Sequence, residues 1–115
     1  MLRLLLLAGA VGFFPAAPVA FAGEPPEPNG ARRGELVRLV RQDCGSCHGM
    51  TLKGGLGLPL TAEALRDKPA ESLAATIVYG RPGTAMPPWS RFLSETEADW
   101  IVGRLMAGFP DEGQR

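Results

Sequence analysis

The residues with the clearest chemical potential form one short run, Cys44-Gly45-Ser46-Cys47-His48. This run contains both cysteines and the single histidine of the chain. Two thiols separated by two residues can add to the two vinyl groups of a haem, and the adjacent imidazole can reach its iron. We therefore predict one covalently attached haem c, held by Cys44 and Cys47, with His48 as an axial ligand of the iron.

A redox or structural disulfide and a zinc site are the two other chemistries that these residues allow. A thioredoxin-like Cys-x-x-Cys motif needs a βαβ context, but no segment shows the alternating pattern of a strand. A structural zinc ion takes four ligands, whereas the chain has two cysteines and one histidine in total. Both alternatives are therefore disfavoured relative to haem attachment.

A second axial ligand is expected from a methionine. Met86 lies in the loop Gly83-Thr84-Ala85-Met86-Pro87-Pro88-Trp89, and a loop can present a thioether that a packed helix would hide. Met50 is too close to His48 along the chain to reach the other haem face, and Met106 lies on an apolar stripe that predicts core packing. A haem iron ligated by histidine and methionine favours electron transfer over substrate binding, so we expect an electron carrier with no catalytic residues and not an enzyme.

Apolar periodicity predicts that helices position these residues and that the fold is all-α. The first helix is expected over residues 34–44, where Leu36, Val37 and Val40 share a face with Cys44. Capping and stop signals predict three further helices, from Thr61 to 65, from Pro69 to 79, and from Ser94 to about 107. The glycine-rich segment 49–60 and the segment 81–92 are expected to be loops, the first wrapping closely around a bound group.

The N-terminal residues have the pattern of a Sec-type signal peptide. Arg3 gives a positive start, an apolar stretch follows, and Ala20-Phe21-Ala22 is a small-x-small cleavage site. We expect residues 1–22 to be cleaved and the protein to reach the periplasm of a Gram-negative bacterium without a membrane anchor; an uncleaved anchor is the alternative. Residues 23–30 are then a flexible proline-rich lead-in, 31–109 the folded domain, and 110–115 a tail.

Composition is that of a single small globular domain. The 115 residues are 45% hydrophobic and 21% charged, with 12 basic and 12 acidic side chains. Arg3 is the only charged residue among residues 1–22, so the mature chain stays close to neutral after their removal. Nucleic acid binding normally needs a clustered basic surface, so we expect no nucleic acid partner.

The order of these features resembles a class I cytochrome c, over roughly residues 31 to 109. The resemblance implies about four short helices wrapped around one haem. In that family a loop proline carbonyl accepts a hydrogen bond from the ligand histidine, which implies that Pro59 orients His48. The donors of Tyr79, Arg81 and Trp89, which lie on either side of Met86 along the chain, are candidates for haem propionate or edge contacts.

Packing around the first and last helices is expected to differ from the family pattern. The family usually has a glycine and an aromatic before the first cysteine, where this chain has Leu36 and Val40. Trp100 lies almost opposite the apolar stripe of the last helix, near Gly103. We expect Gly103 to let the first helix approach closely, with the indole covering the crossing; an exposed Trp100 for partner docking is the alternative.

Two stretches resemble a narrower group, cytochrome c-55X of denitrification: Cys44 to Gly55 and Ile77 to Trp89. That resemblance implies a carrier that either donates electrons to cytochrome cd1 nitrite reductase or accepts them from the dehydrogenase that completes haem d1. We expect the protein to be a monomer. A subunit of another periplasmic dehydrogenase, and a haem protein that binds a small ligand such as nitric oxide in place of Met86, are the other functions considered.

Overall fold

The computed structural model describes residues 12, 15–16 and 23–110, so the expected signal peptide falls almost wholly outside the described residues. The described residues form helices and loops, with no strand among them. The helices are α1 (Gly30–Leu39), the π-helix η1 (Val40–Cys44), α2 (Gly45–His48), α3 (Ala62–Leu65), α4 (Ala70–Tyr79) and α5 (Glu95–Met106). Because α1, η1 and α2 are continuous, the described residues contain four helical segments, and the predicted all-α class is confirmed. Within the described part of the chain, no helix has the length and apolar character needed to cross a membrane.

The first helical segment begins earlier than predicted. The expected start at Gly34 is wrong, because the side chain of Asn29 accepts a hydrogen bond from the backbone nitrogen of Arg32 at 2.9 Å. An asparagine in this position satisfies one of the free N–H groups of the first turn and so fixes the start of a helix. Two glycines in the first turns, Gly30 and Gly34, lower the intrinsic helix propensity and obscure this start in the sequence.

The same segment also continues further than predicted, through the cysteine motif to His48. The change of pitch lies in η1, where the backbone nitrogen of Gly45 donates to the carbonyl of Val40, five residues earlier. Single π-turns of this kind occur mostly inside α-helices, and they are frequent at functional sites. Here the π-turn comes directly before the Cys-x-x-Cys-His motif, so the wider turn determines the direction in which the motif leaves α1.

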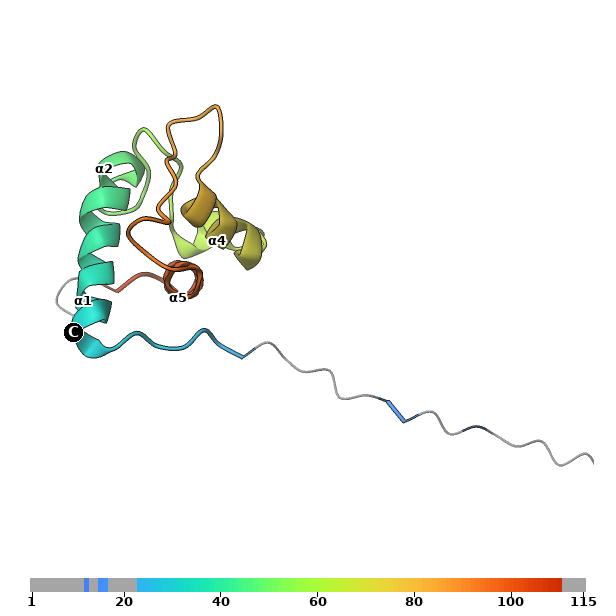
Figure 1. Cartoon of the computed structure of the whole chain (residues 1–115). Helices are drawn as coiled ribbons and strands as arrows, with labels where there is room; N and C mark the ends of the chain where they lie inside the picture. Colours follow the sequence, from blue (N-terminus) through green and yellow to red (C-terminus); the bar gives the residue numbers. More distant parts are fainter. Residues whose placement is uncertain (1–11, 13–14, 17–22, 111–115) are drawn as a thin grey trace, which may run out of the picture.

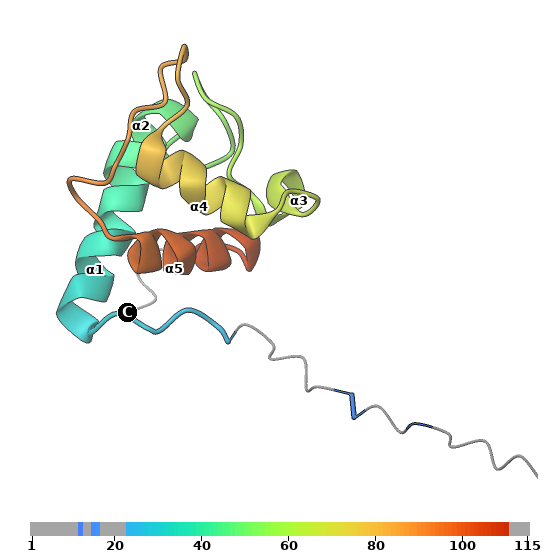
Figure 2. The ribbon, with the colours of Figure 1, turned by 45° about the vertical axis from the view of Figure 1, so that its right-hand side comes forward.

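Helix α5 packs against α3 and α4 and lies across α1 (Figures 1 and 2). Its start is the predicted capping box, in which Ser94 and Glu97 bond each other's backbone nitrogens at 3.2 and 2.8 Å. The buried core comes from all four helical segments and two loops, and it includes Leu36 and Val40 from the apolar face predicted for the first helix. Its members are Leu36, Val40, Leu52, Leu65, Ala74, Val78, Leu93, Ala98, Trp100, Ile101, Val102 and Leu105.

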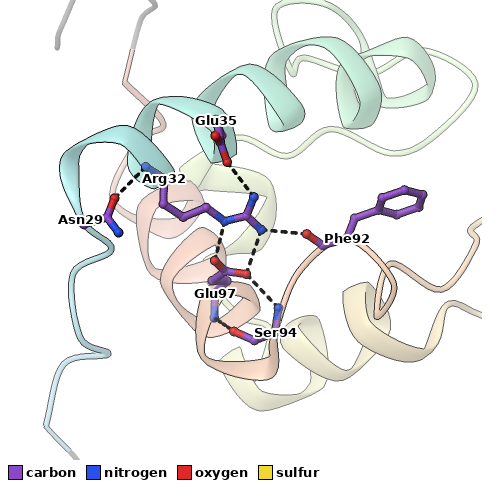
Figure 3. A network of polar contacts seen from close by, with 6 residues as sticks. All are labelled: Asn29, Arg32, Glu35, Phe92, Ser94 and Glu97. Atoms are coloured by element: carbon purple, nitrogen blue, oxygen red, sulfur yellow. Dashed lines mark hydrogen bonds and ion pairs between the residues drawn. The ribbon is translucent and has the colours of Figure 1, made fainter.

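One arginine joins the first and last helices (Figure 3). Arg32 in α1 makes a two-pronged pair with Glu97 in α5, from Nε to Oε1 at 2.6 Å and from Nη2 to Oε2 at 3.1 Å. Its Nη2 also donates to the carbonyl oxygen of Phe92 at 2.7 Å, and its Nη1 pairs with Glu35 at 2.9 Å. Because Glu97 also belongs to the capping box, this network fixes the start of α5 against α1.

Trp100 is buried, at 3% exposed, and the residue that accepts its indole hydrogen comes from the lead-in. Glu27 Oε2 accepts from Trp100 Nε1 at 2.8 Å, and Oε1 of the same carboxylate pairs with Arg33 at 3.3 Å. The expected role of Gly103 is wrong: a methyl group added there would have no atom within 4 Å, so this glycine faces open space and no helix approaches it. Residues 23–29 of the lead-in have no regular secondary structure, and this segment is attached to the domain at Glu27.

Candidate haem site

His48 lies at the end of α2, and its ring is held by a backbone carbonyl of the glycine loop, residues 49–60. The imidazole Nδ1 lies 2.7 Å from the carbonyl oxygen of Leu58. A carbonyl only accepts, so Nδ1 carries the hydrogen, and the lone pair of Nε2 is left for a metal. The prediction that the Pro59 carbonyl accepts this hydrogen bond is wrong, because the carbonyl of the preceding residue, Leu58, supplies the oxygen. The ring of Pro59 packs over Gly54.

The glycine loop approaches the motif as closely as the sequence suggested. A Cβ at Gly57 would lie 2.7 Å from Nδ1 of His48, and one at Gly55 would lie 2.8 Å from the carbonyl oxygen of Cys47. The backbone nitrogen of Gly57 donates to the Cys47 carbonyl at 2.7 Å, and that of Gly54 donates to the His48 carbonyl at 2.8 Å. Only residues without a side chain allow this contact, so the loop and the imidazole are positioned together.

Leu52 anchors this loop in the core and was not expected from the sequence. Its φ is +61°, in the left-handed region that leucine rarely adopts, and its side chain is 3% exposed. Its backbone nitrogen donates to Gly49 and its carbonyl accepts from Leu60, at 2.8 and 2.9 Å. Burial of the leucine side chain offsets a conformational cost of about 1–2 kcal/mol. The loop is therefore fixed at Leu52 and at the imidazole of His48.

The two cysteines of the motif form no disulfide with each other. Cys44 is half-buried and Cys47 is exposed. Burial, with smaller contributions from Asp43 and Cys47, raises the pKa of the Cys44 thiol to about 11. The thiol spacing, the imidazole with a free Nε2 and the glycine loop pressed against it all fit a covalently bound haem.

The methionine loop, residues 80–93, is built around a tight turn. Gly80 begins it with φ of +69°, where a Cβ would lie 2.8 Å from the carbonyl oxygen of Met86. The backbone nitrogen of Arg81 donates to that same carbonyl at 3.0 Å, and the backbone nitrogen of Trp89 donates to Ile77 at 2.9 Å. The turn therefore places the half-buried Met86 just beyond the end of α4.

The three donors expected near a haem edge differ in their surroundings. The Tyr79 hydroxyl donates to Glu95 at 2.9 Å, and this carboxylate raises the pKa of Tyr79. The structure thus gives the Tyr79 hydroxyl a protein partner, and Tyr79 remains a candidate for a haem edge contact. The half-buried Trp89 packs against Phe92 with 5.6 Å between ring centroids, and Arg81 is exposed. No side-chain hydrogen bond involves Trp89 or Arg81 within the described residues, so both remain candidates.

The elements that carry these residues meet at one end of the molecule. In both views α2, the glycine loop and the methionine loop lie together at the end away from the lead-in (Figures 1 and 2). Sequence reasoning missed Leu58 and Leu52, because one acts through its carbonyl and the other through an unusual backbone conformation. The glycine content of the segment was the available signal for close backbone approach.

Comparison with known proteins agrees with this arrangement. Residues 31–103 match the family model described as cytochrome c oxidase, cbb3-type, subunit III. The chain is 58% identical over 81 residues to cytochrome c55X of Pseudomonas aeruginosa, an alignment that covers 70% of this chain and 68% of that protein.

Two solved structures are similar in fold and sequence. The c-type cytochrome NirC superposes with a TM-score of 0.70 at 56% identity, over 71% of this chain and 96% of NirC. The dihydro-heme d1 dehydrogenase NirN, solved in complex with DHE, superposes with a TM-score of 0.58 at 36% identity, over 70% of this chain but only 17% of NirN. This chain therefore corresponds to nearly all of one protein and to a small part of the other.

Proposed function

Because the chain belongs to the c-type cytochrome family, in the group of cytochrome c55X, we propose that it carries single electrons in the periplasm between redox proteins of nitrite reduction and haem d1 synthesis. The observation that carries this proposal is the imidazole of His48, held through Nδ1 by the Leu58 carbonyl so that Nε2 is available to iron. A haem covalently attached at Cys44 and Cys47 would supply the one-electron chemistry.

We propose Met86 as the second axial ligand. Its loop lies at the same end of the molecule as α2, and the tight turn that presents it is closed by the chain's own hydrogen bonds. The alternatives are less suitable: Met50 is 64% exposed and follows His48 by two residues, and Met106 is part of α5. A thioether on the iron favours the reduced state and keeps small molecules off the metal, which suits a carrier.

The redox partners are the second part of the proposal. The chain resembles NirC along most of its length and resembles a part of NirN, a dihydro-heme d1 dehydrogenase. We propose that this protein either accepts electrons from such a dehydrogenase or donates them to cytochrome cd1 nitrite reductase. It is expected to act as a monomer after cleavage of residues 1–22.

The test of haem ligation is the absorption spectrum of the ferric holoprotein beside that of Met86→Ala, with Met106→Ala as the matched control. The proposal expects the methionine-to-iron band in the wild type and in Met106→Ala, and its loss in Met86→Ala. Retention of the band in Met86→Ala would show that another residue is the ligand.

The test of the partner is stopped-flow mixing. Reduced protein is mixed with oxidised cytochrome cd1 nitrite reductase, and ferric protein with the dihydro-haem d1 dehydrogenase and its substrate. An electron-transfer rate that saturates with partner concentration in one of the two experiments identifies the direction of electron flow. If both rates rise only linearly with concentration and equal those of an unrelated cytochrome, the proposed partners are wrong.

A further inference from the structure

The turn that presents Met86 is closed by the side chain of Thr84. Its Oγ1 donates to the carbonyl oxygen of Arg81 at 2.7 Å and accepts from the backbone nitrogen of Met86 at 3.3 Å. The backbone adds two bonds across the same turn, from the nitrogen of Thr84 to the Arg81 carbonyl at 3.1 Å and from the nitrogen of Arg81 to the Met86 carbonyl at 3.0 Å. One hydroxyl thus connects the first and last residues of the turn.

Core packing does not explain the position of Thr84. The side chain is exposed, and both of its hydrogen bonds stay within the turn. Neighbouring residues Pro82, Gly83 and Ala85 are exposed as well, so little apolar burial holds this part of the loop. Local hydrogen bonds of serine and threonine side chains to nearby backbone groups are the usual means of fixing such a segment.

We propose that Thr84 is a positioning residue that holds Met86 in its ligating position and limits opening of the methionine loop. This inference rests on the proposed ligation of the iron by Met86. An external ligand reaches the iron only when the sulfur has left, so its apparent affinity is proportional to the fraction of molecules with an open loop. The proposal requires that these hydrogen bonds of Thr84 break when the sulfur leaves the iron, so that they lower the open fraction and their removal raises it.

The experiment is an imidazole titration of the ferric holoprotein, followed by loss of the methionine-to-iron band. Binding forms a nitrogen–iron bond as the sulfur–iron bond breaks, with no change in oxidation state. Thr84→Val keeps the shape of the side chain but removes both bonds, and it is expected to bind imidazole on the order of tenfold more tightly, which corresponds to about 1.4 kcal/mol. Thr84→Ser keeps Oγ and is expected to stay within about threefold of wild type.

Two further variants separate the possible outcomes. Thr76→Val also removes one threonine hydrogen bond, to Ser72 in α4 at 2.9 Å, and is expected to leave imidazole affinity unchanged. Met86→Ala removes the competing ligand and is expected to bind imidazole most tightly.

Equal affinities for Thr84→Val, Thr76→Val and wild type, together with tight binding by Met86→Ala, would overturn the role of Thr84 and leave the ligation intact. A Met86→Ala protein that binds imidazole like wild type would instead overturn the ligation itself. If Thr84→Ser binds as tightly as Thr84→Val, the hydroxyl is not the responsible group.

Discussion

Replacement of Arg32 by glutamine should destabilise the folded protein by about 2 kcal/mol. The variant loses two hydrogen bonds to Glu97, at 2.6 and 3.1 Å, and one to the Phe92 carbonyl, at 2.7 Å. Three bonds at about 1 kcal/mol each give about 3 kcal/mol. The side chains of Arg32 and Glu97 are 32% and 21% exposed, so water and solvent screening recover part of this amount.

The assay is guanidinium unfolding of the ferric holoprotein, followed by far-ultraviolet circular dichroism. The midpoint should fall while the slope of free energy against denaturant stays constant, because the surface exposed on unfolding is unchanged. In a domain of this size, the loss of about 2 kcal/mol in unfolding free energy lowers the melting temperature by roughly 10 °C. Arg38→Gln, at an exposed position of the same helix, serves as the control and should change stability by less than about 0.5 kcal/mol.

The effect should also depend on pH. The Arg32 guanidinium lowers the pKa of the Glu97 carboxyl from its ordinary value of 4.5. A carboxyl whose pKa is lower in the folded state contributes stability above its unfolded pKa and loses it as the pH falls through the folded value. The difference between wild type and Arg32→Gln should therefore be constant near neutrality and shrink below pH 4.5. Equal losses for Arg32→Gln and Arg38→Gln, or a difference that does not shrink as the pH falls below 4.5, would refute the assigned role of the pair.

Three smaller changes give further expected outcomes. Gly57→Ala should cost about 1–3 kcal/mol in unfolding free energy and broaden the haem absorption bands, because its Cβ would lie 2.7 Å from Nδ1 of His48. Gly103→Ala should raise the free energy of unfolding by up to about 1 kcal/mol in the same assay, because an added methyl group meets nothing within 4 Å and glycine is a poor helix former. A lower free energy of unfolding would show that the methyl group meets another part of the protein. Glu27→Ala should cost about 1 kcal/mol and alter the near-ultraviolet circular dichroism of Trp100, whose indole nitrogen loses its acceptor; an unchanged spectrum would argue against the contact.

Helix α5 was the element most fully predictable from sequence. Its start depends on two side chains three residues apart, and its buried face depends on a regular spacing, so both signals are local. The caps of α3 and α4, Thr61 and Pro69, were predictable for the same reason. The haem motif was predictable because its chemistry requires a fixed spacing of residue types.

Features that depend on tertiary contacts or on backbone groups were not predictable. The acceptor for His48 is a carbonyl, which every residue carries, so residue type could not distinguish Leu58 from Pro59. The left-handed Leu52 contradicts local preference and exists because its side chain is buried. Likewise, the partner of Trp100 lies 73 residues away, in a segment whose composition suggests only a linker.

The attachment of the lead-in at Glu27 has a practical consequence for electrochemistry. The chain before α1 leaves the domain on the side away from the two loops that flank the haem motif (Figures 1 and 2). A linker or surface-binding tag placed before Glu27 would therefore immobilise the protein with those loops turned toward the solution. On an electrode coated in this way, every protein molecule would present these loops to a redox partner in solution. The current from a single adsorbed layer would then report only on partner encounters at that face.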